Sequence, residues 1–110
     1  KYHEALRVMD EGVRELYSAI EADDAYRQRT VFVVVPDCGR DNNRMMPVPF
    51  QHHFNSKSAH EIFAVIAGPE KWVPRPAQPQ ARRLHQIGVA QTVGNLMGFA
   101  APLAAGAALL

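Results

Sequence analysis

The first hydrophobic pattern of the chain is helical. Within residues 3–22, hydrophobic side chains recur every three or four positions, and charged side chains fill the other faces. The hydrophobic positions are Leu6, Met9, Val13, Leu16, Tyr17 and Ile20. This repeat predicts an amphipathic α-helix of about five turns, with one hydrophobic stripe to pack against another layer.

Two later runs are hydrophobic without alternation and rich in β-branched and aromatic residues. They predict strands at residues 30–35 and 61–67, the first closed by Pro36 and the second by Gly68 and Pro69. Strands that are hydrophobic on both faces lie in a sheet that is covered on both sides. Since two such strands need neighbours, we expect the rest of a larger domain, or a second copy of the chain, to complete the sheet.

The C-terminal part of the chain has no charged side chain from residue 84 to residue 110. A membrane span is not expected, because the segment is rich in Ala and Gly, is broken by Pro102 and contains several polar side chains. The pattern instead predicts a buried helix at residues 82–97, capped by Gly98 and followed by a packed tail. Before it, residues 71–80 are expected to form a Pro-rich surface connection anchored by Trp72.

The composition is that of one globular α/β segment spanning residues 1–110. Its 110 residues are 47% hydrophobic and 21% charged, and 12 Lys and Arg balance 11 Asp and Glu. Without an excess of positive charge, nucleic acid is not an expected partner. The single cysteine, Cys38, forms no internal disulfide and leaves the compartment open.

A long polar loop follows the first predicted strand. It starts at Asp37 and Cys38 and continues through His52 and His53 to Ser58. Ligands of open α/β sheets bind at the carboxyl ends of strands, and compact domains keep loops of this length for function or partner binding. The alternatives are a turn-forming role for Asp37 and an inert, small side chain at Cys38.

Three segments of the chain, in this order, resemble the C-terminal part of the alkaline phosphatase superfamily, which includes phosphatases, sulfatases, phosphodiesterases and phosphomutases. They are Thr30-Val-Phe-Val-Val-Val-Pro-Asp-Cys-Gly-Arg-Asp41, Gln51-His-His-Phe54 and Ser58-Ala-His-Glu-Ile-Phe-Ala-Val-Ile-Ala-Gly-Pro69. The helices before and after them, around Asp10 and Thr92, are also similar to those of the family. The resemblance covers most of the chain and implies part of a layered fold in which hydrophobic strands are flanked by helices.

The resemblance also implies a set of metal ligands. Asp37 matches an aspartate that binds one of two catalytic metals, and His53 matches a later histidine ligand, with His52 as the competing register. Cys38 stands where the family has a histidine. A thiolate binds zinc well and disfavours Mg²⁺, Ca²⁺ and Mn²⁺, so zinc is the expected divalent metal. Asp37 and His53 should then share one depression, with His52 pointing elsewhere and Arg40 at the rim.

The function that the resemblance implies is the C-terminal part of a metal-dependent hydrolase of small phosphate or sulfate esters. The family nucleophile and an Asp-x-x-x-His pair of ligands come earlier in the family's sequences. We therefore assign no catalytic residue here and expect the 110-residue chain alone to be inactive. Export from the cytoplasm is suggested only by the family.

Two other functions stay open. One is a non-catalytic remnant or interaction module of the same fold, because Cys38 departs from the family's pattern. The other is a small metal-binding α/β domain that uses Asp37, Cys38, His52 and His53.

Overall fold

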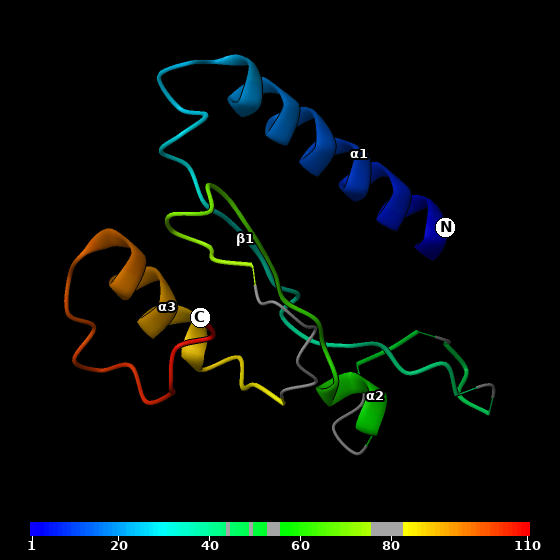
Figure 1. Cartoon of the computed structure of the whole chain (residues 1–110). Coiled ribbons are helices and arrows are strands. Elements are labelled where there is room, and N and C mark those ends of the chain that lie inside the picture. Colours follow the sequence, from blue (N-terminus) through cyan, green and yellow to red (C-terminus); the bar gives the residue numbers. More distant parts are fainter. Residues whose placement is uncertain (44, 49, 53–55, 76–82) are drawn as a thin grey trace. The chain divides into compact units, whose positions relative to one another are not determined.

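The computed structural model describes residues 1–43, 45–48, 50–52, 56–75 and 83–110. It contains helices and one small sheet in the order α1, β1, α2, β2 and α3, so the fold is mixed α/β (Figure 1). The chain divides into two compact units, Lys1–Gly68 and Pro69–Leu110. The boundary falls at the Gly-Pro pair that follows β2.

Helix α1 (Tyr2–Ala22) confirms the predicted amphipathic helix. Its charged face carries a ladder of ion pairs, in which Arg7 bridges Glu4 at 2.8 Å and Glu11 at 3.5 Å. Arg14 adds a third pair with Glu11 at 3.1 Å. All these side chains are exposed, so each pair contributes little to stability.

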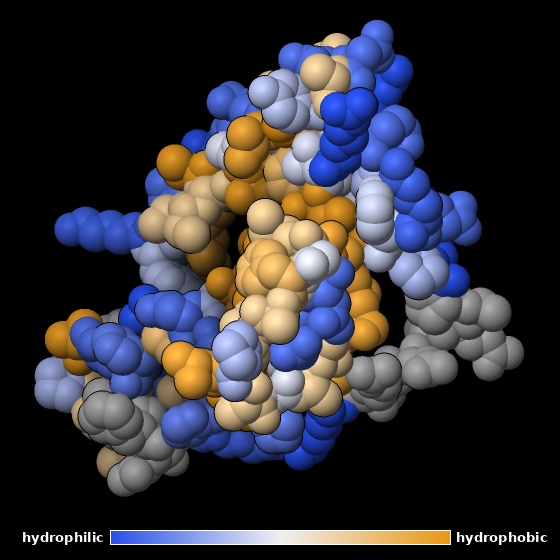
Figure 2. All heavy atoms as spheres, turned by 90° about the vertical axis from the view of Figure 1, so that its left-hand side faces the viewer, coloured by the Kyte–Doolittle hydropathy of each residue, from blue (hydrophilic) through white to orange (hydrophobic). Residues whose placement is uncertain are grey.

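The hydrophobic stripe of α1 is not buried as expected. The structure describes the whole helix, and none of its residues is buried; Met9 is 67% exposed and Leu16 56% exposed. Aromatic side chains of α1 contact the rest of the first unit. Tyr17 lies against Phe32, and Tyr2 stacks on Phe50 with 4.8 Å between the ring centroids. Hydrophobic side chains consequently reach the surface, as the orange spheres in Figure 2 show.

Strands β1 (Phe32–Val34) and β2 (Val65–Ala67) pair antiparallel, in the register Phe32↔Ala67, Val33↔Ile66 and Val34↔Val65. Both lie within the predicted ranges 30–35 and 61–67 but are shorter. Pro36 has no N–H for the ladder, and helix α2 (Lys57–His60), which the sequence did not predict, leads the chain into β2. All strand residues are half-buried or exposed, so the described residues alone do not cover both faces of the sheet.

Helix α3 (Gly88–Met97) lies within the predicted 82–97 but begins later; residues 76–82 lie outside the described part. Its N-cap residue, Ile87, has no side-chain oxygen to bond the first turn. The predicted cap at Gly98 is confirmed: its φ is 77°, its N–H donates to the Asn95 carbonyl, and the Phe99 N–H donates to the Gly94 carbonyl. These two bonds form a Schellman motif.

The C-terminal tail packs on α3, as predicted. Thr92 is 1% exposed; its hydroxyl donates to the Gly88 carbonyl at 2.7 Å and accepts the Leu109 N–H at 2.8 Å. Leu109 is also buried, and a Cβ on Gly88 would collide with the Ala107 carbonyl oxygen. No helix in the described part of the chain is long and hydrophobic enough to cross a membrane.

Thr92→Val is expected to lower the free energy of unfolding by about 1–3 kcal/mol, because it leaves the buried Leu109 N–H without an acceptor. Urea denaturation measures the loss. Thr30→Val is the matched control. The Thr30 hydroxyl donates to the Tyr26 carbonyl at an exposed position, where water can replace the lost hydrogen bond. Equal stability of the two variants would contradict this role of Thr92.

Candidate functional site

The candidate site begins where β1 ends. Pro36 closes the strand, and Asp37 turns the chain by accepting hydrogen bonds on its Oδ1 atom. The Cys38 N–H donates to this oxygen at 2.9 Å, and the Cys38 Sγ–H donates to it at 3.6 Å. Both candidate ligands therefore lie at one corner of the loop.

The two side chains differ in protonation. The hydrogen bond from the Cys38 backbone, followed by that from its thiol, lowers the pKa of Asp37 below its ordinary value of 3.8. Partial burial, followed by the negative charge of Asp37, raises the pKa of the Cys38 thiol. At neutral pH the pair is thus a carboxylate and a thiol, and a bound metal would displace the thiol proton, as metal binding to cysteine requires.

The spacing of the pair fits one zinc ion. A zinc–oxygen distance of about 2.1 Å and a zinc–sulfur distance of about 2.3 Å, at a tetrahedral angle, separate the two ligand atoms by about 3.6 Å. The Asp37 Oδ1 and Cys38 Sγ atoms lie 3.6 Å apart. This separation alone is compatible with both atoms binding one tetrahedral zinc ion.

The long loop folds back to this corner. The Asp41 N–H donates to the Gln51 carbonyl at 2.7 Å in an antiparallel bridge, and the Gly39 N–H donates to the Ala59 carbonyl at 2.8 Å. Phe50, directly before Gln51, has a left-handed φ of 62°, which is rare for a large side chain. The ring stack of Phe50 on Tyr2 helps to hold this conformation.

Arg40 and His52 meet across the folded loop. Arg40 Nη1 lies 3.1 Å from His52 Nδ1, which accepts an N–H of the guanidinium. The Arg40 charge also acts on the corner: it is the smallest of the causes that lower the pKa of Asp37, and it opposes in part the rise in the pKa of Cys38. The structure thus places a cation beside the candidate metal ligands.

The structure gathers some of the predicted site residues. Asp37, Cys38 and Arg40 follow β1 together, and His52 returns to Arg40; His53 lies outside the described residues. Within the described ranges, no three His, Cys, Asp or Glu side chains are close enough to hold a metal. The sequence did not predict the Arg40–His52 contact, and no motif signals it, because it depends on how the loop closes.

The lowered pKa of Asp37 predicts an acid-sensitive corner. Its folded-state pKa lies below that of the unfolded chain, so ionised Asp37 stabilises the fold above the unfolded value. That contribution is lost as the pH falls through the folded value. We expect Cys38→Ala to raise the Asp37 pKa only partway towards 3.8, because the backbone N–H, the larger cause, remains. Carboxyl-carbon NMR titration measures the Asp37 pKa in the original chain and in Cys38→Ala. An unchanged Asp37 pKa in the variant would exclude the thiol's role.

Comparisons of the chain with family models, curated proteins and solved structures found no match.

Proposed function

We propose that the chain is the C-terminal part of a metal-dependent hydrolase of phosphate or sulfate esters, with a layered fold like that of the alkaline phosphatase superfamily. Asp37 and Cys38 contribute to a two-metal site, and His53 is a further ligand. The strongest support is the separation of 3.6 Å between Asp37 Oδ1 and Cys38 Sγ, which suits one tetrahedral zinc ion.

Bound metal would act as a Lewis acid that stabilises negative charge on the ester oxygens. Arg40 is suited to hold the anionic group of the ester, because guanidinium binds phosphate and sulfate oxygens through two parallel N–H bonds. His52 accepts only one N–H of Arg40, at 3.1 Å, and thereby orients the guanidinium. The pair would position substrate beside the metal ligands without taking part in bond breaking.

The exposed hydrophobic stripe of α1 indicates what kind of partner the chain has. Leu6, Val13 and Leu16 are all more than 40% exposed on one face of a long amphipathic helix, and such a face is normally covered by another layer. We assign the remainder of the same domain as the cover, with a second copy of the chain as the alternative. A non-catalytic interaction module is the second candidate function, and the same exposed stripe is the observation that favours it.

Reconstitution of the complete protein tests the function. The protein is stripped with a chelator, reloaded with Zn²⁺ or Mg²⁺, and assayed on an aryl phosphate, an aryl phosphodiester and an aryl sulfate. We expect Zn²⁺ to restore hydrolysis of at least one ester and Mg²⁺ to restore it poorly, because a thiolate ligand favours zinc. If neither metal supports hydrolysis of any of the three, the protein is not this hydrolase and the interaction module is favoured.

A further inference from the structure

We propose that the tip of the loop after β1, residues 45–48, inserts into the surface of an anionic membrane. The loop tip reads Met-Met-Pro-Val, and all four residues are exposed, Met45 at 92% and Val48 at 54%. Folded chains seldom expose four consecutive apolar residues without a function for them. In Figure 1 this loop reaches out from the end of β1 before it returns to α2.

The backbone of the loop tip is held in a turn by Asn43. The Met45 N–H donates to Asn43 Oδ1 at 3.0 Å, and the Met46 N–H donates to the Asn43 carbonyl at 3.2 Å. Pro47 has no N–H. Three of the four tip residues therefore have no backbone donor that insertion would deprive of water, a loss that is costly in hydrocarbon. The tip carbonyls keep their water in the head-group region, because a shallow tip places mainly its side chains in the hydrocarbon.

The loop tip stands on a closed neck. The Asp41 N–H donates to the Gln51 carbonyl at 2.7 Å, so the two arms of the loop are joined by an antiparallel bridge before the tip begins. A loop closed in this way loses less conformational freedom when it binds. The methionine side chains at the tip are unbranched and adapt to an irregular apolar surface.

The charge pattern along the loop suits an anionic surface. Between Asp41 and Glu61 the sequence contains no acidic residue, whereas Arg44 and Lys57 are basic. Lys57 is exposed on α2, and its partner at 3.3 Å is Glu61, at the end of this segment. A basic side chain next to an inserted tip keeps its charge at the level of the head groups. Each such charge raises the affinity for an anionic membrane about fivefold.

The size of the loop tip favours a bilayer over a protein as its partner. A specific protein interface takes about 20–30 residues and about 800 Å² from each partner, which four residues at one turn do not supply. A bilayer is fluid and accepts a small convex tip without a matching pocket. A myristoyl chain alone binds membranes with an association constant of about 10⁴ M⁻¹, and the shorter side chains of the tip should bind more weakly and reversibly.

Vesicle sedimentation of the complete protein tests the proposal. Binding to vesicles of phosphatidylcholine and phosphatidylserine is compared with binding to vesicles of phosphatidylcholine alone. No ester substrate is present, so the outcome is independent of the proposed function. We expect binding to the mixed vesicles, little binding to phosphatidylcholine alone, and weaker binding at high salt, because salt screens the attraction between the charges.

Met45→Glu is the decisive variant, and Leu103→Glu is its matched control. Leu103 is 97% exposed but lies in the second unit, in a segment without charged side chains. Met45→Glu should weaken binding to the mixed vesicles at least tenfold, because it removes an apolar side chain and adds a charge that anionic lipid repels. Leu103→Glu should bind like the original protein. Circular dichroism verifies that both variants keep their helices.

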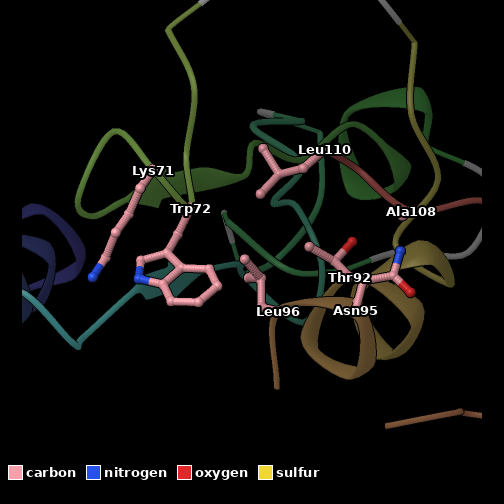
Figure 3. A pocket seen from close by; sticks show the side chains of 7 residues that line it. All are labelled: Lys71, Trp72, Thr92, Asn95, Leu96, Ala108 and Leu110. Carbon is pink, nitrogen blue, oxygen red and sulfur yellow. The ribbon is translucent and has the colours of Figure 1, made fainter. Parts of the chain in front are cut away.

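A tryptophan at the loop tip measures insertion directly. The single tryptophan of the 110-residue chain, Trp72, lines a pocket of the second unit with Leu96 and Leu110 (Figure 3), and Trp72→Phe removes its emission. In this background we expect the emission added by Met45→Trp to be quenched by lipids brominated in their acyl chains. The emission added by Leu103→Trp should not be quenched.

Three results would overturn the proposal. The first is no binding to the mixed vesicles at up to about 10 mM lipid, a hundredfold above the reciprocal of the myristoyl constant; another protein surface would then be favoured as the cover of the tip. The second is equal binding to both kinds of vesicle, or a folded Met45→Glu protein that binds as tightly as the original. The third is Met45→Trp emission that brominated lipid leaves unchanged.

Discussion

Asp37→Ala in the complete protein is expected to remove metal from the site and to lower ester hydrolysis at least 100-fold. Loss of even an outer-shell partner of a metal ligand typically lowers metal affinity or activity 10–100-fold, and loss of a ligand costs more. Asp37 is a carboxylate at neutral pH, and the two hydrogen bonds from Cys38 lower its pKa further. The negatively charged form is the one that binds a cation. Metal content by atomic emission and steady-state hydrolysis measure the two effects.

Asp24→Ala is the matched control for this prediction, because Asp24 is an exposed aspartate that pairs with Arg27 in the turn after α1. We expect it to keep both metal and activity. His53→Ala should resemble Asp37→Ala, while His85→Ala, outside the site, should resemble the original protein. Unchanged metal content and hydrolysis in both Asp37→Ala and His53→Ala would eliminate these ligands. Loss of hydrolysis with full metal content would instead place Asp37 in a different role.

The features that could be predicted from the sequence depend on neighbours along the chain. The three- and four-residue repeat determines α1 within one residue at its start, and Gly98 ends α3 because a glycine adopts the left-handed cap at low cost. Asp37 and Cys38 could be placed after the first strand because Pro36 closes that strand. Each of these inferences uses residues a few positions apart.

The features that the sequence did not reveal depend on distant contacts. The strand lengths follow from a three-residue antiparallel register between segments about thirty residues apart, and α2 forms where no hydrophobic repeat marks a helix. The Arg40–His52 contact requires the loop to close through the Asp41–Gln51 bridge. Likewise, the Leu109 N–H donates to the Thr92 hydroxyl only once the tail has folded back on α3. The pattern of neighbouring residues along the chain does not predict any of these contacts.

Gly39→Ala is expected to destabilise the first unit by about 3 kcal/mol. A Cβ at this position would overlap the Ser58 carbonyl oxygen and lie 3.0 Å from the Glu61 carbonyl oxygen, and both of these atoms belong to the backbone. Relief of the clash requires the segments to separate, which breaks the 2.8 Å bond from the Gly39 N–H to the Ala59 carbonyl and exposes the buried Ala59. Overpacking of this kind costs about 1–3 kcal/mol, and loss of the backbone bond adds to it.

Gly12→Ala is the matched control and should have the opposite sign. Among the described residues, no atom outside the local helix lies within 4 Å of a Cβ at Gly12, which is inside α1. Alanine there should therefore stabilise the chain by about 1 kcal/mol through its higher helix propensity. Urea denaturation followed by circular dichroism measures both changes. Because Gly39 lies between Cys38 and Arg40, Gly39→Ala should also weaken zinc binding by the complete protein, while Gly12→Ala leaves it unchanged. A Gly39→Ala protein that is as stable as the original would show that the loop does not return to Ala59.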